Sequence, residues 1–486
     1  MQAKAAGACL LHRVELDGDR LVLLVDPRGV ELRGAVLVGT RATVPGQVAV
    51  DVAGVVTLSF DLHPSRWGVS GLALPSGDYV VRLAGPAGDD LPMEGVAAQE
   101  VLTDLFRARV AAEDGGLVLQ MSAPLRDDEI GTAQQRRLRL AALRPRRKQN
   151  AVCFESFYGR TASDNPLGID RAVARLLPDV TRYWCVTDRS VAVPEGAVPL
   201  VQFSEQWWRV RAHARLVVAN DWLRWTYPRQ PGQHVLQTWH GTMLKRLALD
   251  RPGRPPLQRL WVVRQSLRWS ALLAQNDYSA QVLRRAYAFR GPVWVTGYPR
   301  NDVLADTARA TRVREVLGID ADARVVLWAP TWRDDRAGLV EHLDVAAFAA
   351  GLPHDHVVVV RGHSRTLAHG ADLLLVADVL VTDYSSLMFD FAATGRPLVL
   401  FVPDLDHYAD VLRGFYFDLR DAAPGPLVDT VAELRSEVLR AQPGDERYAE
   451  RLATWQQRFT PLDADGRAGE RVVRELLRRR WLRAPR

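Results

Sequence analysis

Two serine hydroxyls stand at the start of a predicted helix, where they could bind a phosphate group. The segment Thr382 to Ser386 follows an apolar run, 377–381, and precedes a helix-like run, 387–394. A buried strand that ends before a helix directs the first N–H groups of that helix, and the hydroxyls of Ser385 and Ser386, toward the same space. The same residue types cap ordinary helices, so these residues alone leave both interpretations open.

Two of the eleven histidines lie in glycine-flanked loops after apolar runs. His240 lies in the segment Trp239 to Thr242, and His363 lies in the segment 360–365. Histidine is the natural base near neutral pH, so either residue could take the proton of an alcohol that attacks a phosphoanhydride. That reaction also needs cationic groups or helix ends to stabilise the phosphate charge. Most histidines in such loops are structural, and the residues alone leave that role open.

Several familiar kinds of site are absent from the sequence. No GxxxxGK[ST] or GxGxxG motif occurs at a predicted strand–helix junction, which disfavours a P-loop ATPase or an NAD enzyme. The nearest carboxylate pair, Asp334 and Asp335, is typical of a solvated loop, and Cys9, Cys153 and Cys185 lack metal-ligand spacing. We therefore expect neither a metal nor a cofactor.

Composition places the chain among globular proteins. Its 486 residues are 48% hydrophobic and 25% charged, and that length predicts two or three domains. The net charge of +6 is carried almost wholly by arginine, which suits phosphate or phospholipid partners but also fits a high-GC codon bias. No export signal and no uninterrupted apolar run of membrane-spanning length is found, so we expect any membrane association to be peripheral.

The hydrophobic pattern changes near residue 150. Residues 1–135 alternate β-favouring runs with turn signals, which predicts an antiparallel, β-sandwich-like N-terminal domain. Residues 150–290 and 291–460 alternate strands with helices, and the second series of strands begins at 293–296. The predicted fold is therefore α/β, with two Rossmann-like domains facing each other in the arrangement called GT-B. The dense polar motifs stand at the carboxyl ends of predicted strands, where open α/β sheets bind ligands.

Two basic segments flank these domains. Residues 136–149 are predicted to form a basic linker, which is either solvated or in contact with anionic lipid. Residues 461–486 are predicted to form a basic amphipathic helix. This helix either packs as the last helix of a two-domain transferase or lies on the anionic inner face of a membrane.

Six polar blocks in a fixed order resemble the CDP-glycerol glycerophosphotransferases, which polymerise or prime teichoic acids. The resemblance covers about residues 150–425 and leaves the N-terminal domain outside it. The blocks are 154–166, 237–242, 297–302, 329–334, 382–386 and 412–418.

The resemblance implies roles for particular residues. His240 would be the general base on the acceptor hydroxyl, and His363, in an Arg-x-His element, would engage the donor phosphates. Asp383 would shape the turn, holding either a neighbouring loop or the ligand, and Gly241 and Thr242 would shape the histidine loop. The residues that would bind or balance the donor phosphates are Thr382, Ser385, Ser386, Arg300, Arg333, Lys245 and Arg413.

The implied activity is transfer of glycerol phosphate from CDP-glycerol to a hydroxyl of a lipid-linked or polymeric acceptor, with release of CMP. The implied location is the cytoplasmic face of the cell membrane, peripherally bound at an anionic surface and without nucleic acid. Alternatives are a CDP-ribitol donor, a nucleotide-sugar transferase or epimerase on the same fold, and a non-catalytic basic scaffold. Oligomeric state, chain length of the product and the acceptor stay open.

Overall fold

The computed structural model describes most of the chain as two compact units. Unit 1 comprises residues 1–144, 185–193 and 199–210, and unit 2 comprises residues 145–184, 194–198 and 211–486. The described residues are 10–27, 32, 34–65, 69–84, 97–113, 116–227, 229–331, 343–361, 370–407 and 414–483.

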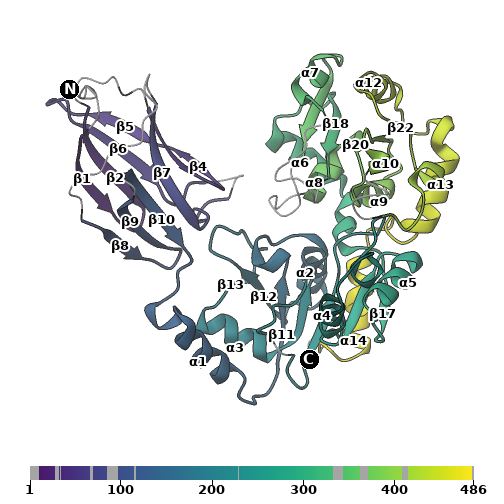
Figure 1. Cartoon of the computed structure of the whole chain (residues 1–486), viewed down its shortest axis with the longest axis horizontal. Coiled ribbons are helices and arrows are strands. Elements are labelled where there is room, and N and C mark those ends of the chain that lie inside the picture. Colours follow the sequence, from purple (N-terminus) through teal and green to yellow (C-terminus); the bar gives the residue numbers. More distant parts are fainter. Residues whose placement is uncertain are drawn as a thin grey trace. The chain divides into compact units, whose positions relative to one another are not determined.

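Unit 1 contains two antiparallel sheets around one apolar core (Figure 1). Apolar side chains alternate inward along β2, as at Leu21, Leu23 and Val25, and along β3 and β6, and both sheets contribute to the same cluster of buried side chains. The antiparallel sheets predicted for the N-terminal region are confirmed. One sheet has the order β1 (Leu10–Leu16), β2 (Arg20–Asp26), β6 (Val56–Asp61), β5 (Gln47–Val50). The other has the order β4 (Thr43–Pro45), β3 (Gly34–Gly39), β7 (Gly77–Ala84), β10 (Gly116–Ser122), β9 (Arg107–Glu113), β8 (Gln99–Leu102).

The basic segment 136–149, predicted to be a linker, is helical in its first half. Helix α1 spans Thr132–Ala142 and buries Leu138 and Ala142, so part of the segment is packed. The sequence pattern did not predict this helix, because many of its residues are arginines and only Leu138 and Ala142 are buried.

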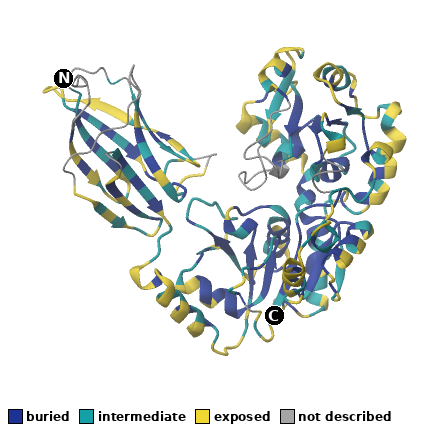
Figure 2. Ribbon diagram, viewed as in Figure 1, coloured by how far each residue is buried: buried dark blue, intermediate teal, exposed yellow. Residues whose placement is uncertain are grey.

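A larger sheet has most of its strands in unit 2, and the strand pairs recorded within it are parallel. Its central strands are buried on both faces, as expected where helices cover a parallel sheet (Figure 2). The order is β13 (Val198–Val201), β12 (Thr181–Val186), β11 (Gln149–Glu155), β14 (Ala214–Ala219), β15 (His234–Gln237), β16 (Ala271–Ala274), β17 (Val293–Val295). The helices of this region include α2 (Asp164–Leu176), α3 (Glu205–His213), α4 (Pro256–Ser266) and α5 (Asp277–Ala286).

One strand assignment from the sequence is wrong. The run 293–296 was expected to open the second series of strands, but β17 pairs with β16 in the first sheet. Strand β16, the four residues Ala271–Ala274, was not predicted at all. A run of three or four apolar residues carries no information about which sheet it joins, and this decision is made by tertiary pairing.

Unit 2 also carries a five-stranded parallel sheet with apolar clusters on it. Short helix α9 (Leu387–Ala392) follows β20 directly and buries five of its residues. The mixed α/β character with parallel sheets is thus confirmed. The order is β19 (His356–Val360), β18 (Arg324–Ala329), β20 (Val379–Thr382), β21 (Leu398–Phe401), β22 (Leu427–Val428). The later helices are α6 (Thr307–Leu317), α7 (Val345–Ala350), α8 (Gly370–Val376), α10 (Leu405–His407), α11 (Leu419–Ala422), α12 (Val431–Arg440) and α13 (Glu446–Phe459).

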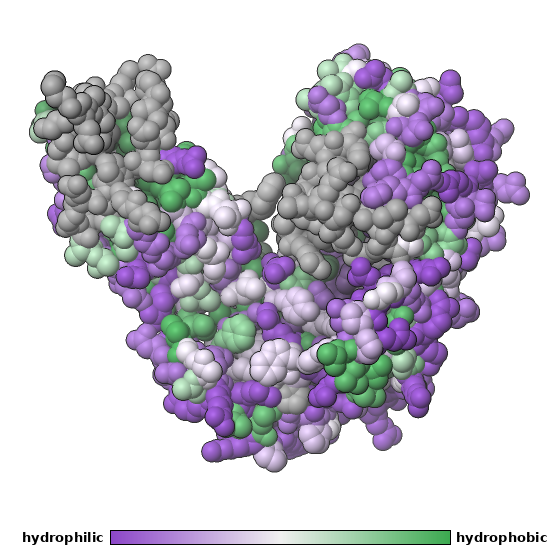
Figure 3. Space-filling view, viewed as in Figure 1, coloured by the Kyte–Doolittle hydropathy of each residue, from purple (hydrophilic) through white to green (hydrophobic). Residues whose placement is uncertain are grey.

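The last helix, α14 (Ala468–Arg478), packs its apolar face inside unit 2. Val472, Val473 and Leu476 are buried, and α14 contacts α2 and the 3-10 helix η4 (Pro299–Ala305). Beyond the helix, the Trp481 ring stacks on His234 at 4.4 Å between centroids. Among the described residues no helix has the length and apolar character to cross a membrane. Hydrophilic side chains dominate the face of unit 2 shown in Figure 3.

A carboxylate from another segment caps α14. The Asp302 carboxylate accepts hydrogen bonds from the backbone N–H groups of Ala468 and Gly469, each at 2.8 Å, and satisfies two donors of the first turn. Burial raises the pKa of Asp302 to about 6.

We predict that Asp302→Ala lowers the free energy of unfolding by about 1–3 kcal/mol, since two buried N–H groups lose their acceptor. Chemical denaturation of the purified protein measures this change. The matched control is Asp465→Ala. The Asp465 carboxylate is half-exposed, accepts from the backbone N–H of Arg467 just before α14, and pairs with Arg471. Equal losses for the two variants would contradict the capping role.

Candidate functional site

His240 is held in one tautomer at the carboxyl end of the larger parallel sheet. Its Nδ1 lies 2.7 Å from the backbone carbonyl oxygen of Asn220, at the end of β14. A carbonyl oxygen can only accept, so Nδ1 carries a hydrogen, and in the neutral ring the lone pair is then on Nε2. The ring stacks on Trp239 at 4.6 Å and lies 5.6 Å from the ring of Phe157. The geometry therefore presents Nε2 as the atom that can accept a proton.

The loop that carries His240 is fixed by hydrogen bonds from several elements. Trp239 has the left-handed φ of 54°, and its backbone N–H donates to the Gln237 side chain at 2.9 Å. The side-chain amide of Asn165, in α2, donates to the Trp239 carbonyl at 3.2 Å. Thr242 is buried, and its hydroxyl donates to the Gln275 side-chain oxygen, so it positions the loop from inside.

Gly241 brings this loop against the serine segment. A Cβ atom at Gly241 would lie 2.6 Å from the Ser386 Oγ and 2.8 Å from the Ser386 Cβ. Real Cβ atoms do not approach other atoms so closely, so only glycine permits this contact. Two motifs that are 145 residues apart in sequence therefore meet, and the His240 loop lies directly beside the start of α9.

The serine segment has the geometry expected of a strand-to-helix turn. Ser385 Oγ accepts from the Leu387 N–H at 3.3 Å, whereas the Ser386 side chain makes no capping hydrogen bond with α9. Thr382 donates to the Ala329 carbonyl at 2.6 Å. The Asp383 carboxylate accepts from the N–H of Thr331 at 2.9 Å, so these two residues tie the end of β20 to the loop after β18. Of the two serines, Ser386 is the one whose hydroxyl makes no capping hydrogen bond with α9.

Arg300 connects the histidine loop to α9 through two carboxylates. Its guanidinium pairs with Asp164 at 2.9 Å and with Asp390 at 2.5 Å, and it donates to the His240 carbonyl at 2.8 Å. Asn301 donates to Asp390 at 3.0 Å. Burial raises the pKa of Asp390, and the neighbouring Arg300 opposes that shift. Two carboxylates balance the charge of Arg300. Its ion pairs and hydrogen bond therefore mainly hold α2, α9 and the histidine loop together.

Lys245 lies where two segments pair. It forms a β-bridge with Phe415, and the Arg246 N–H donates to the Gly414 carbonyl at 3.0 Å. The Tyr416 N–H donates to the Leu244 carbonyl at 2.8 Å, so the segment after the histidine loop is joined to residues 414–416. His363, Arg333 and Arg413, which were also predicted site residues, lie outside the described residues.

Sequence reasoning missed Arg361, which follows β19 directly. Burial lowers the pKa of Arg361 to about 10, and the positive charge of Arg300 acts in the same direction. Its buried Nε has no hydrogen-bond partner among the residues that the structure describes. The carboxylates of Asp390 and Asp164 act on it electrostatically, which places it near the Arg300 network. The arginine stands in the Arg-x-His element, but the sequence analysis assigned a role only to the histidine.

Metal ligands are not clustered in the part of the chain that the structure describes. No group of three or more His, Cys, Asp or Glu side chains with metal-binding geometry occurs in the described ranges.

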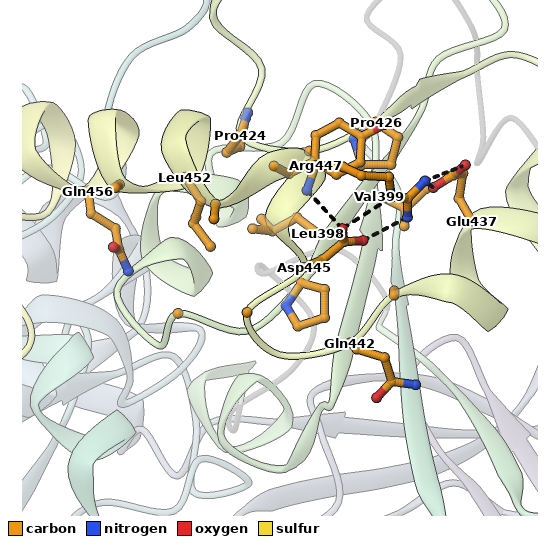
Figure 4. Close-up of a pocket in the computed structure, with 18 residues that line it drawn as sticks. Leu398, Val399, Pro424, Pro426, Glu437, Gln442, Asp445, Arg447, Leu452 and Gln456 are labelled. Atoms are coloured by element: carbon orange, nitrogen blue, oxygen red, sulfur yellow. Dashed lines mark hydrogen bonds and ion pairs between the residues drawn. The ribbon is translucent and has the colours of Figure 1, made fainter.

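A pocket elsewhere in unit 2 is separate from this site (Figure 4). It lies at the amino ends of β21 and β22, among Leu398, Pro426 and residues of α12 and α13. Arg447 at its edge is paired with Asp445 at 2.7 Å. None of the predicted site residues lines it, and the serine segment lies at the opposite, carboxyl end of the same sheet.

Fold and site together define a mixed α/β protein in which a tautomer-fixed histidine from one parallel sheet meets a serine turn from another. A family model described as CDP-Glycerol:Poly(glycerophosphate) glycerophosphotransferase matches residues 137–478, which is more than half of the chain. The chain belongs to this family, and the resemblance seen in the sequence is confirmed.

Individual relatives agree with the family match. The chain is 33% identical over 362 residues to a teichoic acid poly(glycerol phosphate) polymerase of Bacillus subtilis, covering 67% of this chain and 48% of the relative. It is 32% identical over 369 residues to a teichoic acid glycerol-phosphate transferase of Staphylococcus aureus, covering 68% and 93%. The chain thus spans about half the length of the first relative and nearly all of the second.

A solved structure shares the fold over most of this chain. The structure of the wall teichoic acid polymerase TagF aligns with a TM-score of 0.65 and 28% identity, covering 72% of this chain and 94% of that chain.

We predict that Gly241→Ala lowers stability by about 1–3 kcal/mol, because the added methyl group overlaps Ser386. The double variant Gly241→Ala with Ser386→Gly should recover part of this loss, with a coupling energy of about 0.5–3 kcal/mol. Denaturant titration of the four proteins in the cycle measures it. A control cycle combines Gly241→Ala with Ser385→Gly. A coupling energy of equal size in the two cycles would contradict a direct contact between Gly241 and Ser386.

Proposed function

We propose that the protein transfers glycerol phosphate from CDP-glycerol to a hydroxyl of a lipid-linked or polymeric acceptor and releases CMP. The observation that carries this proposal is the close approach of Gly241, next to His240, to Ser386. It supports a role for His240, whose Nδ1 is bound to the Asn220 carbonyl, as a proton acceptor beside a turn suited to phosphate. The names of the relatives support it, and a variant of TagF was solved after soaking with CDPG.

In the proposed reaction Nε2 of His240 takes the proton of the acceptor hydroxyl. The hydroxyl oxygen attacks the phosphorus atom of the glycerol phosphate group of CDP-glycerol at the same time. A P–O bond forms to the acceptor, and the bond from that phosphorus to the bridging oxygen breaks. CMP leaves with the bridging oxygen and its electron pair. The proton on His240 then passes to solvent or to the leaving phosphate, which restores the base.

The donor phosphates are proposed to lie against Ser385, Ser386 and Arg361. Arg361 is a stronger candidate for a phosphate ligand than Arg300. The charge of Arg300 is already balanced by two carboxylates, whereas burial lowers the pKa of Arg361, so a bound phosphate would stabilise its charge. His363, Arg333 and Arg413 keep their proposed roles at the donor from the family resemblance alone. Thr382, Asp383, Gly241 and Thr242 hold the backbone of the two motifs, and Lys245 contributes positive charge beside the histidine loop.

The two parallel sheets of unit 2 are proposed to form a GT-B pair, with the acceptor approaching from the His240 side. A lipid-linked acceptor would place the enzyme peripherally at the cytoplasmic face of an anionic membrane. Val472, Val473 and Leu476 of α14 are buried in unit 2, so this helix would meet a membrane mainly through its exposed polar face, which includes Arg474 and Arg478.

We predict that His240→Ala lowers CMP release by about 10²- to 10⁴-fold without unfolding the protein, since a positioned general base is lost. The assay combines CDP-glycerol with a glycerol-phosphate-primed lipid analogue. His354→Ala, on an exposed residue, is the control and should keep normal turnover. Normal turnover by a folded His240→Ala variant would refute the proposed base, and release from CDP-ribitol instead of CDP-glycerol would change the donor.

Arg361 and Arg300 should respond differently to substitution. Arg361→Gln is expected to lower kcat/KM for CDP-glycerol by about 10²-fold with little loss of stability, because it removes a charge aimed at phosphate. Arg300→Gln is expected to lower the free energy of unfolding by about 3–5 kcal/mol, because two buried carboxylates lose their partner. Steady-state kinetics and denaturation of both variants separate the roles. The assignment of Arg361 fails if its variant is destabilised as strongly as the Arg300 variant.

A further inference from the structure

Asp463, on the segment between α13 and α14, is a buried carboxylate held by neutral donors. It is 3% exposed, and its Oδ1 accepts from the Tyr298 N–H at 2.9 Å and from the Asn301 side-chain amide at 3.0 Å. Its Oδ2 accepts from the side-chain amide of Gln275 at 3.2 Å. Within the described part of the chain no cationic side chain pairs with it. Burying a carboxylate without a cation costs free energy, and groups held at such a cost are concentrated at functional sites.

Gln275 connects Asp463 to the loop that carries His240. It follows β16 directly and is fully buried. Its side-chain NH2 group donates to Asp463, and its side-chain oxygen accepts from the hydroxyl of Thr242. The Thr242 Oγ1 also lies 3.1 Å from the Ser279 Oγ. A chain of hydrogen bonds therefore runs from the C-terminal segment to a residue two positions after the histidine.

A second chain of contacts joins Asp463 to the same loop. The side-chain amide of Asn301 donates to Asp463 and to Asp390, each at 3.0 Å. Asp390 pairs with Arg300, and Arg300 donates to the His240 carbonyl at 2.8 Å. The histidine loop is thus held at two points, and both chains of contacts meet at the Asp463 carboxylate.

We propose that Asp463 is a positioning residue for the transfer reaction, because it fixes the loop that presents His240 through Gln275 and Thr242. An ionised carboxylate can only accept hydrogen bonds, so it requires the NH2 group of Gln275 to point toward it. The oxygen of Gln275 must then face Thr242 and accept from its hydroxyl. The carboxylate therefore decides the direction of every hydrogen bond in this chain.

An asparagine at position 463 would remove this control. It has nearly the same shape, but it would place an NH2 group against the NH2 group of Gln275. Gln275 could then turn its amide over to satisfy the asparagine, and the Thr242 hydroxyl would lose its acceptor. The role of His240 in this inference rests on the proposed function, whereas the hydrogen-bond chain itself is independent of catalysis.

The test is a reciprocal exchange at positions 275 and 463. Asp463→Asn should lower kcat for CMP release by about 10- to 10²-fold, because a displacement of about 1 Å at a reacting group costs this much. The KM for CDP-glycerol should change little, since the donor phosphates are proposed to bind at the serine turn. Gln275→Glu alone places two carboxylates in contact and should also lower kcat.

The double variant Gln275→Glu with Asp463→Asn should recover most of the lost kcat. The introduced asparagine then donates to the introduced carboxylate, which still accepts from the Thr242 hydroxyl. Asp465→Asn is the matched control on the same segment and should keep normal kcat, because its half-exposed carboxylate pairs with Arg471. Denaturant titration of all four variants shows whether kcat merely follows the free energy of unfolding.

A second measurement does not depend on turnover. Nitrogen NMR of the protein labelled at histidine, with His240→Ala to assign the signals, reports which ring nitrogen of His240 carries the hydrogen. Asp463→Asn should shift these signals from the Nδ1–H form toward the mixture of tautomers of free histidine. The double variant should restore them, and it also decides the outcome if Asp463→Asn does not fold.

Three results would overturn the proposal. They are normal kcat and normal His240 signals in Asp463→Asn, a double variant no better than Asp463→Asn, and losses of kcat in proportion to losses of stability across all the variants. Absence of CMP release from the unmodified protein, with the His240 signals responding as expected, would instead refute the proposed function and support the positioning of His240 by Asp463.

Discussion

The buried ion pairs of Arg300 are the interaction on which the site depends. Its guanidinium joins Asp164 at the start of α2, Asp390 in α9 and the carbonyl of His240. Burying these charges costs free energy unless every partner is present, so the three segments must adopt their places together. The histidine loop and the serine turn are therefore held in register by a residue that need not contact substrate.

The 3-10 helix η4 extends this constraint to the end of the chain. Three consecutive residues of η4 bind three different parts of unit 2. Arg300 pairs with Asp390 of the site, and Asn301 donates to Asp390 and Asp463. Asp302 accepts from the first turn of α14. Burial raises the pKa of Asp463 to about 7, yet its carboxylate accepts hydrogen bonds from Tyr298 and Asn301. One short element thus couples the geometry of the candidate site to the packing of the C-terminal helix.

The arginine excess is used in two different ways. Arg300 lies inside the protein with carboxylate partners, whereas the arginines around α4 surround exposed leucines without carboxylates in the same stretch. Net charge alone cannot distinguish these uses, because both contribute equally to the total of +6. Burial and pairing decide whether an arginine organises the fold or lies at the surface.

The sequence by itself determined the antiparallel N-terminal sheets, the parallel sheets after residue 150 and the family, because strand periodicity and the polar blocks are local signals. Tertiary structure alone decided that β17 joins the first sheet, that Asp390 pairs with Arg300, and that α4 rather than α14 leaves its leucines exposed. These outcomes depend on which segments meet across long separations. No pattern within a short window encodes the partner that buries an apolar face or balances a charge.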